Sequence, residues 1–409
     1  MKIAIIGGGA AGMMAAITAS ESGADVTIYE HMARVGKKIL VTGSGKCNIA
    51  NEDTDLVHYH SSDDNLSLVK NVFSHVSPAS MLAGFTELGL VTKNKRGYIY
   101  PFSEQASSVL DILRFAIRDR NIRVIVEAKV TSVDSLVIGG FTVNTTDGSD
   151  ETFDRIIIAA GSCANKKTGS DGSGYEIAKA FGHSIVKPLP ALTYLECKEN
   201  YYSSVAGIRT SAKVTICGQS EEGQLQFTKT GISGINVFNL SYLAAKSLDN
   251  GEDVSAFIDF MPDMETENFR DLMYKRVRDY KERPLEELFI GILNKNLGHL
   301  IIKESGIFAK FSDLCSELTV EDIKRIVQKT KNFEVKVKAC GGFDNSQVIC
   351  GGVDTTEVND KLESLKTPGV YFAGEILDVN GDCGGYNLTF AFCSGIYAGL
   401  CAANEHDKN

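Results

Sequence analysis

Glycines and one carboxylate near the N-terminus form the first pattern in the chain that could do chemistry. Gly7, Gly9 and Gly12 follow a G-x-G-x-x-G spacing, and Glu30 lies 23 residues after Gly7. In such a pattern the first glycine makes a tight turn, the second lets the backbone approach a pyrophosphate, and the third lets a helix pack closely on a strand. The spacing therefore indicates a dinucleotide site, with Glu30 as the hydrogen-bond acceptor for an adenosine ribose.

A second pattern of glycines and carboxylates stands near the C-terminus. The apolar run Gly369–Ala373 ends in a glycine and a carboxylate, and a further acid and a glycine-rich loop lead into an apolar helix expected over 388–403. A carboxylate at a strand end suits the ribityl hydroxyls of a flavin, and a helix N-terminus stabilises negative charge on the flavin ring. A simple NAD dehydrogenase needs no such second element, so the two patterns together predict FAD. The residues of the second pattern are Gly374, Glu375, Asp378, Gly384, Gly385, Tyr386 and Asn387.

Short buried strands must hold these loops in place. Ile3–Ile6 is fully apolar and runs into the first glycines, Asp25–Tyr29 forms a second strand, and a third strand that begins at Arg155 ends in Ala160 and Gly161. Short apolar runs of this kind are typical of parallel strands that are covered on both faces. We therefore expect an α/β protein with a Rossmann-type domain built from both ends of the chain.

The composition limits the kinds of partner. Of the 409 residues 43% are apolar, so the chain can bury a large core, and its formal net charge of −10 lacks the basic balance of a nucleic-acid-binding surface. No apolar run approaches the roughly 20 residues of a membrane span. The N-terminal residues also lack the pattern of a signal peptide. We expect a small-molecule substrate, no nucleic acid and no membrane, and the oligomeric state stays open.

Cysteines and histidines give no sign of a metal site. The ten cysteines contain no Cys-x-x-Cys pair, so neither a zinc ribbon nor a dithiol relay is expected. Unpaired thiols in this number fit a reducing cytoplasm. His58 and His60 lie in a polar stretch without a nearby carboxylate–histidine group, so we interpret them as ordinary loop histidines.

Four separated motifs resemble one known family. They are Gly7–Gly12, Gly36–Asn48, Phe227–Gly234, and Ala373–Asp378 with Gly384–Asn387. The chain resembles the BaiN-like, or aminoacetone oxidase-like, three-domain FAD-dependent flavoproteins, whose members include an aminoacetone oxidase and a reductase of oxo-bile acids. It departs from the family at Lys46, Lys229 and Ile235, where Arg, His and Pro are common.

The resemblance implies a discontinuous FAD-binding domain of the glutathione-reductase-like superfamily, with an inserted β-barrel domain and a helical domain nested inside the barrel. We expect the FAD-binding domain at 1–185 and 341–409, the barrel at 186–260 and 328–340, and the helical domain at 261–327. The residues agree, because the pattern is strand-like from Ser184 to about Ala245, helical from about Met264 to Val327, and strand-like again at Phe333–Val337.

The resemblance also implies that the loop Thr42–Asn48 lies along the cofactor near the flavin ring. Lys46 could interact with phosphate or with charge on the reduced flavin, and Asn48 could bond the ring edge. Cys47 occupies a plausible functional position, although a packing role is preferred. For Tyr386, a role as proton donor and a role as ring-edge contact are equally favoured. The candidate catalytic residues are thus Tyr386, Lys46 and Cys47. Outside the C-terminal pattern, the expected cofactor contacts are Gly7, Gly9, Ala10, Ala11, Gly12, Glu30, Lys38, Thr42, Gly43, Gly45, Lys46, Cys47, Asn48, Val130, Ala160 and Gly161.

Three classes of function fit these observations. The favoured class is an FAD-dependent oxidoreductase that acts on a small organic molecule by hydride transfer through flavin N5. Within it, NAD(P)H-dependent reduction of a conjugated ketone of the steroid or bile-acid type is preferred to oxidation of a small amine with release of peroxide. A non-catalytic FAD-binding regulatory or assembly protein is the second class. A flavin-dependent RNA-modifying enzyme is the third, and the acidic charge disfavours it.

A resident site for NAD(P)H is not expected. Gly169–Gly174 is rich in glycine, but it begins eight residues after the strand's Gly161 and has no second strand and acid behind it. We interpret it as a loop and helix start beside the cofactor, so a pyridine nucleotide would dock only transiently at the flavin face.

Overall fold

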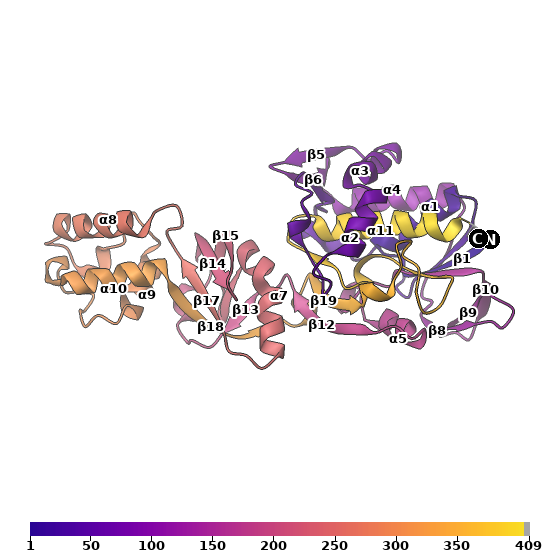
Figure 1. Ribbon diagram of the computed structural model, residues 1–409. Helices are drawn as coiled ribbons and strands as arrows, with labels where there is room; N and C mark the ends of the chain where they lie inside the picture. Colours follow the sequence, from indigo (N-terminus) through magenta and orange to yellow (C-terminus); the bar gives the residue numbers. More distant parts are fainter. Residues whose placement is uncertain (405–409) are drawn as a thin grey trace. The chain divides into compact units, whose positions relative to one another are not determined.

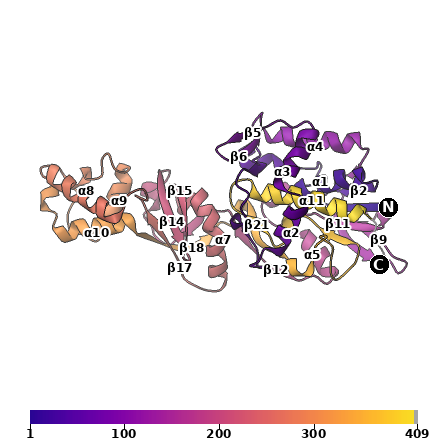
Figure 2. The same ribbon diagram turned by 45° about the horizontal axis from the view of Figure 1, so that its top comes forward.

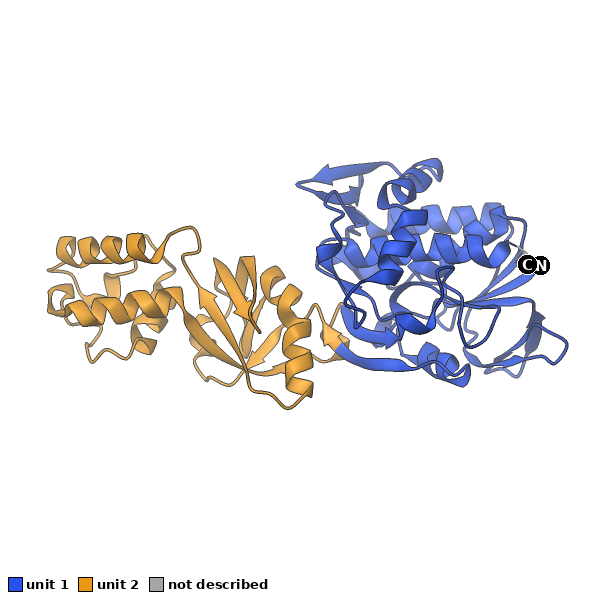
Figure 3. Cartoon of the chain, viewed as in Figure 1, with its two compact units in different colours: residues 1–189, 348–409 blue, residues 190–347 orange. Residues whose placement is uncertain are grey.

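The computed structural model describes residues 1–404 and divides into two compact units (Figure 3). One unit combines Met1–Leu189 with Val348–Asn409, and the other is Pro190–Gln347. Residues 405–409, which belong to the expected FAD-binding domain, lie outside the described part.

A five-stranded parallel sheet forms the centre of the first unit. Its strand order is β20-β11-β1-β2-β7. The side chains of Ile3 and Ile5 on β1 are fully buried although they point to opposite faces, because helices and loops cover the sheet on both sides. The expected strands near the N-terminus and after Arg155 are confirmed. The strand bounds are β1 Lys2–Ile6, β2 Asp25–Tyr29, β7 Arg123–Ile125, β11 Arg155–Ile158 and β20 Val370–Phe372.

Helices from the two ends of the chain pack against each other on this sheet. α1 (Ala10–Glu21) and α11 (Tyr386–Ala403) lie side by side in both ribbon views (Figures 1 and 2). Glycine permits this close approach, because a Cβ on Gly395 would lie 2.4 Å from the carbonyl oxygen of Ala11. Each glycine-rich pattern therefore leads into a helix, and these two helices pack against each other.

Shorter elements surround the central sheet. A three-stranded antiparallel meander has the order β10-β9-β8, a second small sheet has the order β3-β6-β5, and β4 pairs with β21. The helices of this unit are α2 Ser67–His75, α3 Pro78–Glu87, α4 Ala106–Asp119 and α5 Ser173–Ala180. The strands are β3 Ala50–Asn51, β4 Tyr59–His60, β5 Thr92–Lys95, β6 Tyr98–Pro101, β8 Val130–Ser135, β9 Phe141–Thr145, β10 Asp150–Phe153, β12 Ile185–Ala191, β19 Val348–Val353 and β21 Asn380–Gly381.

A closed six-stranded barrel forms one part of the second unit. Its strand order is β13-β16-β15-β14-β17-β18, and inward-facing residues such as Val214, Leu225 and Val335 are fully buried. The strands are β13 Leu195–Cys197, β14 Arg209–Ile216, β15 Gln219–Phe227, β16 Gly231–Gly234, β17 Val254–Asp259 and β18 Phe333–Cys340. A short helix, α6 (Tyr202–Val205), precedes β14.

One expectation about the barrel is wrong. The segment up to Ala245 reads as strand-like, but α7 (Ile235–Asp249) is a helix. Val237, Leu240 and Ala244 are buried at helical spacing, so one face of α7 packs on the barrel.

The helical region belongs to the same compact unit and shares a continuous apolar core with the barrel. It contains α8 (Thr266–Asp279), α9 (Lys295–Glu304) and α10 (Val320–Lys331). The threonine before α10, Thr319, caps the helix in a reciprocal capping box with Asp322. The finer division into three domains stays a prediction. Within residues 1–404, every helix is too short or too polar to cross a bilayer.

Candidate functional site

Two helices of the first unit begin with free backbone N–H groups. α1 starts after Gly9 and α11 after Gly385, and neither helix has a side-chain cap or an acidic residue in its first turn. The first N–H groups of a helix have no partner within the helix, and its N-terminus carries a partial positive charge. Both helix starts are therefore suited to hold negative charge.

The glycines before α1 form an open cradle beyond the end of β1. A Cβ on Gly7 would lie 2.4 Å from the carbonyl oxygen of Ala159 and 2.8 Å from the Cα of Ala160, so only glycine lets these segments meet. A Cβ on Gly9 would meet nothing within 4 Å and would project into open space. This is the arrangement expected where a pyrophosphate approaches the backbone. Ala160 and Gly161 lie just beyond the end of β11, close to this turn.

Glu30 lies at the end of β2 and holds the glycine loop. One carboxylate oxygen accepts a hydrogen bond from the Gly8 N–H at 3.0 Å, and the other accepts one from the Met32 N–H at 2.7 Å. An ionised carboxylate can accept about four hydrogen bonds. Capacity thus remains for ribose hydroxyls, and this role for Glu30 stays a prediction. Val130, another expected contact, is buried at the start of β8.

Glu375, the carboxylate expected at the ribityl chain, has one paired and one unpaired oxygen. Its Oε2 forms an ion pair of 2.5 Å with Nζ of Lys38, and both side chains are mostly buried. Its Oε1 is buried and has no hydrogen-bond partner in the protein. A buried carboxylate oxygen without a donor is costly, so a hydroxyl-bearing ligand fits here. Gly374, beside it, donates its N–H to Oγ of Ser394 on α11 at 2.9 Å.

Asp378, another expected cofactor contact, is bonded on both carboxylate oxygens by the protein, and its role as a cofactor ligand stays a prediction. Its Oδ2 accepts from the backbone N–H of Ser62 at 2.9 Å and from the Ser62 hydroxyl, and its Oδ1 accepts from the Gly351 N–H at 2.9 Å. The side chain is buried. Asp378 therefore ties three segments of the chain together.

Tyr175 is a polar group near Glu375 that sequence reasoning missed. Its hydroxyl is buried without a hydrogen-bond partner. Burial raises its pKa, and the charges of Glu375 and Asp378 add to the rise. The signal lay in Gly169–Gly174, interpreted as a loop and helix start beside the cofactor, because Tyr175 follows it in α5.

The loop Thr42–Asn48 is tightly wound. Gly43 and Gly45 have φ values of 53° and 84°, and the Thr42 hydroxyl donates to the carbonyl oxygen of Ile39 at 2.6 Å. The Oδ1 of Asn48 is buried and has no hydrogen-bond partner, which is the state expected of a group that meets a ligand. Lys46 is half-exposed and lies 3.5 Å from the carboxylate of Glu104.

Cys47 is fully buried. Burial penalises the thiolate and raises the pKa of Cys47 to about 11, although a hydrogen bond from Thr42 opposes the rise. Cys47 is therefore a protonated thiol at neutral pH. Only the thiolate form of a cysteine is a good nucleophile. This favours the packing role preferred for Cys47.

The loop before α11 is fixed by side-chain and backbone contacts. Nδ2 of Asn51 donates to the carbonyl oxygen of Gly384 at 3.1 Å, and the Asn387 amide bonds both the N–H and the carbonyl of Gly381, at 2.8 and 2.7 Å. Tyr386 follows Gly385 as the first residue of the helix. The segment Asn48–Asn51 and the start of α11, two regions more than 330 residues apart, are thereby brought together.

Tyr386 is buried beside carboxylates. Burial raises the pKa of its hydroxyl, and the nearby charges of Asp53 and Asp382 raise it further. The phenol therefore stays protonated at neutral pH and can donate a hydrogen bond.

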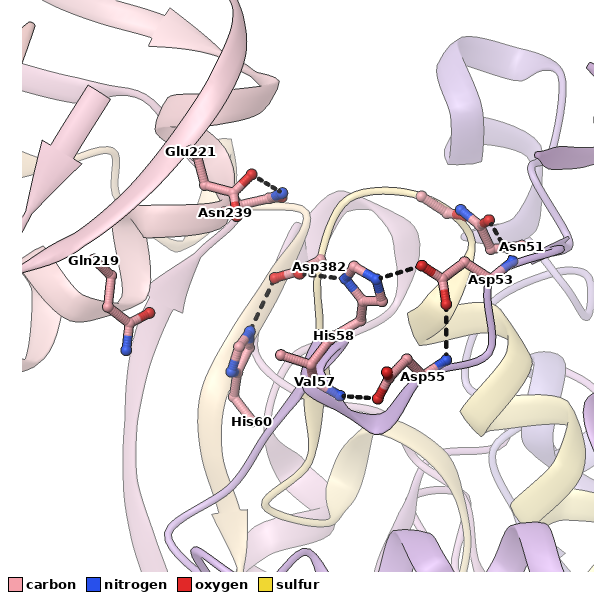
Figure 4. Close-up of polar contacts among 12 residues, drawn as sticks. Asn51, Asp53, Asp55, Val57, His58, His60, Gln219, Glu221, Asn239 and Asp382 are labelled. Carbon is pink, nitrogen blue, oxygen red and sulfur yellow. Dashed lines mark hydrogen bonds and ion pairs between the residues drawn. The ribbon is translucent and has the colours of Figure 1, made fainter. Parts of the chain in front are cut away.

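The interpretation of His58 and His60 as ordinary loop histidines without a nearby carboxylate is wrong, because His58 ends a short 3₁₀ turn, His60 lies on β4, and both contact a carboxylate. Both bind Asp382, in the loop before α11, with nitrogen–oxygen distances of 2.9 Å, and His58 also binds Asp53 at 3.1 Å (Figure 4). Within residues 1–404, no group of three or more His, Cys, Asp or Glu side chains is arranged to hold a metal ion.

Comparison with known proteins agrees with this geometry. Residues 1–401 match the family described as HI0933-like protein Rossmann domain. A 3-dehydro-bile acid delta(4,6)-reductase from Clostridium scindens is 38% identical over 99% of both chains. A ribosomal RNA dihydrouridine synthase from Haemophilus influenzae is 28% identical over 98% of both chains.

A solved structure shares the fold at low sequence identity. The 3-ketosteroid-delta4-(5alpha)-dehydrogenase from Rhodococcus jostii aligns with a TM-score of 0.51 and 14% identity, over 98% of this chain and 96% of that one. The cradle at Gly9, the uncapped helix starts and the unpartnered oxygens of Glu375 and Asn48 fit FAD. The chain therefore belongs to the HI0933-like family and is a flavoprotein oxidoreductase with a Rossmann-type FAD-binding domain.

Proposed function

We propose that this protein is an FAD-dependent reductase of conjugated ketones of the steroid or bile-acid type, with NAD(P)H as the electron donor. The observation that carries the proposal is the 38% identity to a bile acid reductase over 99% of both chains. At this identity and coverage the two chains share the whole site-bearing fold, which supports a shared reaction type.

Different residues of the chain would bind different parts of FAD. The start of α1 and the space at Gly9 would bind the pyrophosphate, Glu30 the adenosine ribose, and Glu375 with Lys38 the ribityl hydroxyls. The uncapped start of α11 would stabilise negative charge on the ring. FAD, when bound, supplies hydride transfer through its N5 atom.

Tyr386 is suited to act on the carbonyl group of the substrate. Its phenol is neutral at physiological pH and lies at the start of α11, so it can donate a hydrogen bond to a ketone oxygen. That bond withdraws electrons from the conjugated double bond and makes its far carbon accept hydride more readily. The reaction adds one hydride and one proton across the double bond, while NAD(P)H is oxidised to NAD(P)⁺.

The electron donor would bind only transiently. Among the described strands, β1 alone leads through a G-x-G-x-x-G loop into a helix, and that unit is assigned to FAD. A nicotinamide cofactor would then reach the flavin from the substrate side, before the ketone enters.

A second candidate function shares this chemistry. Two relatives, 28% and 26% identical, are ribosomal RNA dihydrouridine synthases. The uracil ring also has a carbon–carbon double bond conjugated with a carbonyl, so the same hydride addition would saturate it. The net charge of −10 disfavours RNA as the substrate.

An anaerobic donor and acceptor screen that follows the absorbance of bound flavin tests the proposal. We expect NADH or NADPH to bleach the flavin, and a 4-en-3-oxo or 4,6-dien-3-oxo bile acid to restore its colour. Reoxidation by uridine-containing ribosomal RNA and not by the ketones would favour the second candidate. Reduction only by a small amine, with peroxide formed in air, would identify an oxidase. No reduction by any donor would favour the non-catalytic class.

A further inference from the structure

A network of four side chains joins the segment before β4 to the loop before α11. The His58 ring bridges two carboxylates, with Nδ1 2.9 Å from Asp382 and Nε2 3.1 Å from Asp53. Nε2 of His60 lies 2.9 Å from the second oxygen of Asp382, so each oxygen of this carboxylate meets one imidazole. The backbone adds to the connection, because β4 pairs with β21 and the Asp382 N–H donates to the carbonyl of His58.

The network also holds the ring of Tyr386. The His58 ring stacks on it with centroids 4.4 Å apart and an interplanar angle of 21°. Tyr59 meets the same ring edge-on, with centroids 5.7 Å apart, and donates its hydroxyl to the Tyr386 carbonyl oxygen at 3.2 Å. Tyr386 is thus held by the two consecutive residues His58 and Tyr59, and the ring has little freedom to turn.

Charge explains why a histidine suits this place. The side chain of Asp382 is only 10% exposed, and a carboxylate so far from water needs a positive partner. Burial alone would lower the pKa of His58, but the hydrogen bonds and charges of Asp382 and Asp53 outweigh it and raise that pKa. When His58 is protonated, its ring compensates the charge of the two carboxylates. The other titratable groups of this region are His60, which shares Asp382, Tyr386 with its neighbour Tyr59, and Asp55 and Tyr98, whose charges act on Tyr386.

We propose that His58, clamped by Asp382 and Asp53, is a positioning residue that holds Tyr386 in its working orientation at the start of α11. His60 completes the clamp by occupying the second oxygen of Asp382. This inference rests on the proposed function, in which Tyr386 bonds the ketone. It gives a positioning role to two histidines and two aspartates that are not among the expected cofactor contacts.

The clamp should depend on pH in one direction. A group whose pKa is raised on folding stabilises the folded arrangement below its unfolded pKa, and that stabilisation is lost as the pH rises through the folded pKa. The imidazolium clamp is therefore complete below the unfolded pKa of histidine and weakens as the pH rises through the raised pKa of His58. We expect kcat to fall on the alkaline side as His58 loses its proton.

The experiment compares the FAD-loaded wild-type protein with His58→Gln and Asp382→Asn across pH. His58→Gln should lower kcat by about 100-fold, the scale of a small misplacement of a reacting group, and change KM little. It should also abolish the alkaline fall that His58 causes. Asp382→Asn should move that fall to lower pH, because it removes the main contact that raises the pKa of His58.

His75→Gln is the matched control. His75 stacks on Tyr397 of α11, the helix that begins with Tyr386, with ring centroids 4.6 Å apart and an interplanar angle of 18°. In the described structure no carboxylate forms a hydrogen bond with the His75 ring. This variant should keep the wild-type pH profile. Wild-type kcat and pH profile in His58→Gln, or an unmoved alkaline fall in Asp382→Asn, would overturn the proposal.

A measurement without turnover separates this proposal from the proposed function. The proton resonances of the histidine rings report the pKa of His58 whether or not any ketone is reduced. A lower His58 pKa in Asp382→Asn, together with altered Tyr386 ring signals in His58→Gln, would support the clamp even if every ketone failed as a substrate. An unchanged His58 pKa in Asp382→Asn, together with unchanged Tyr386 ring signals in His58→Gln, would refute the clamp and leave the proposed function intact.

Discussion

Three buried polar atoms without a partner give the clearest indication of where the cofactor binds. Oδ1 of Asn48, Oε1 of Glu375 and the hydroxyl of Tyr175 are all buried without a hydrogen-bond partner in the protein. Native proteins leave few such groups, because each costs about 1–3 kcal/mol. Asn48 and Glu375 were expected as cofactor contacts from the sequence, since each stands in a motif. Tyr175 was not, because a tyrosine in a helix is far more often a core residue.

Glu375→Gln tests this assignment. The change would remove the charge that pairs with Lys38, and loss of a charged hydrogen bond costs roughly 1.5–3 kcal/mol. We expect the dissociation constant of FAD, measured by fluorescence quenching, to rise by about 10- to 100-fold. Asp378→Asn serves as the contrast. It should mainly lower the melting temperature, because Asp378 binds Ser62 and Gly351. An unchanged FAD affinity in Glu375→Gln would contradict the ribityl assignment.

Gly9→Val separates cofactor binding from folding. A Cβ at Gly9 meets no protein atom within 4 Å, so the apoprotein should fold normally. The valine would occupy the space assigned to the pyrophosphate, and we expect the purified variant to be colourless, with the circular dichroism of the wild type. A yellow variant with normal FAD content would show that the dinucleotide lies elsewhere.

At the scale of elements, the sequence predicts best where periodicity and glycine spacing act together. The parallel strands and the two helices that follow the glycine patterns were expected and are present. The helix α7 was missed, because short mixed polar and apolar runs around Ile235–Ala245 fit either period until burial is known. Its true signal was the spacing of Val237, Leu240 and Ala244.

The contact between α1 and α11 makes a prediction about stability. A Cβ on Gly395 would lie 2.4 Å from the carbonyl oxygen of Ala11, which is backbone and cannot move aside cheaply. Overpacking of this kind typically costs about 1–3 kcal/mol. We therefore expect Gly395→Ala to lower the free energy of unfolding by that amount, as measured by urea denaturation. A variant as stable as the wild type would mean that the two helices separate easily.

At the scale of the whole molecule, side-chain contacts between residues far apart in the sequence could not be predicted. His58 and Asp382 are 324 residues apart, and only the folded first unit brings them together. Lys38 and Glu375 are 337 residues apart and were expected separately as cofactor contacts, but their ion pair could not be foreseen. Residue types and motifs identified the family and the cofactor, whereas the polar network around Tyr386 required three-dimensional coordinates.

As a whole, we propose, this flavoprotein passes electrons from NAD(P)H to a conjugated ketone. The most direct measurement is anaerobic stopped-flow absorbance of the protein reduced by NADPH or NADH and then mixed with a 4,6-dien-3-oxo bile acid. We expect the oxidised flavin band to return at a rate that rises with ketone concentration and saturates, with one double bond reduced per flavin. A flavin that stays reduced with every such ketone, and is reoxidised only by oxygen, would contradict it.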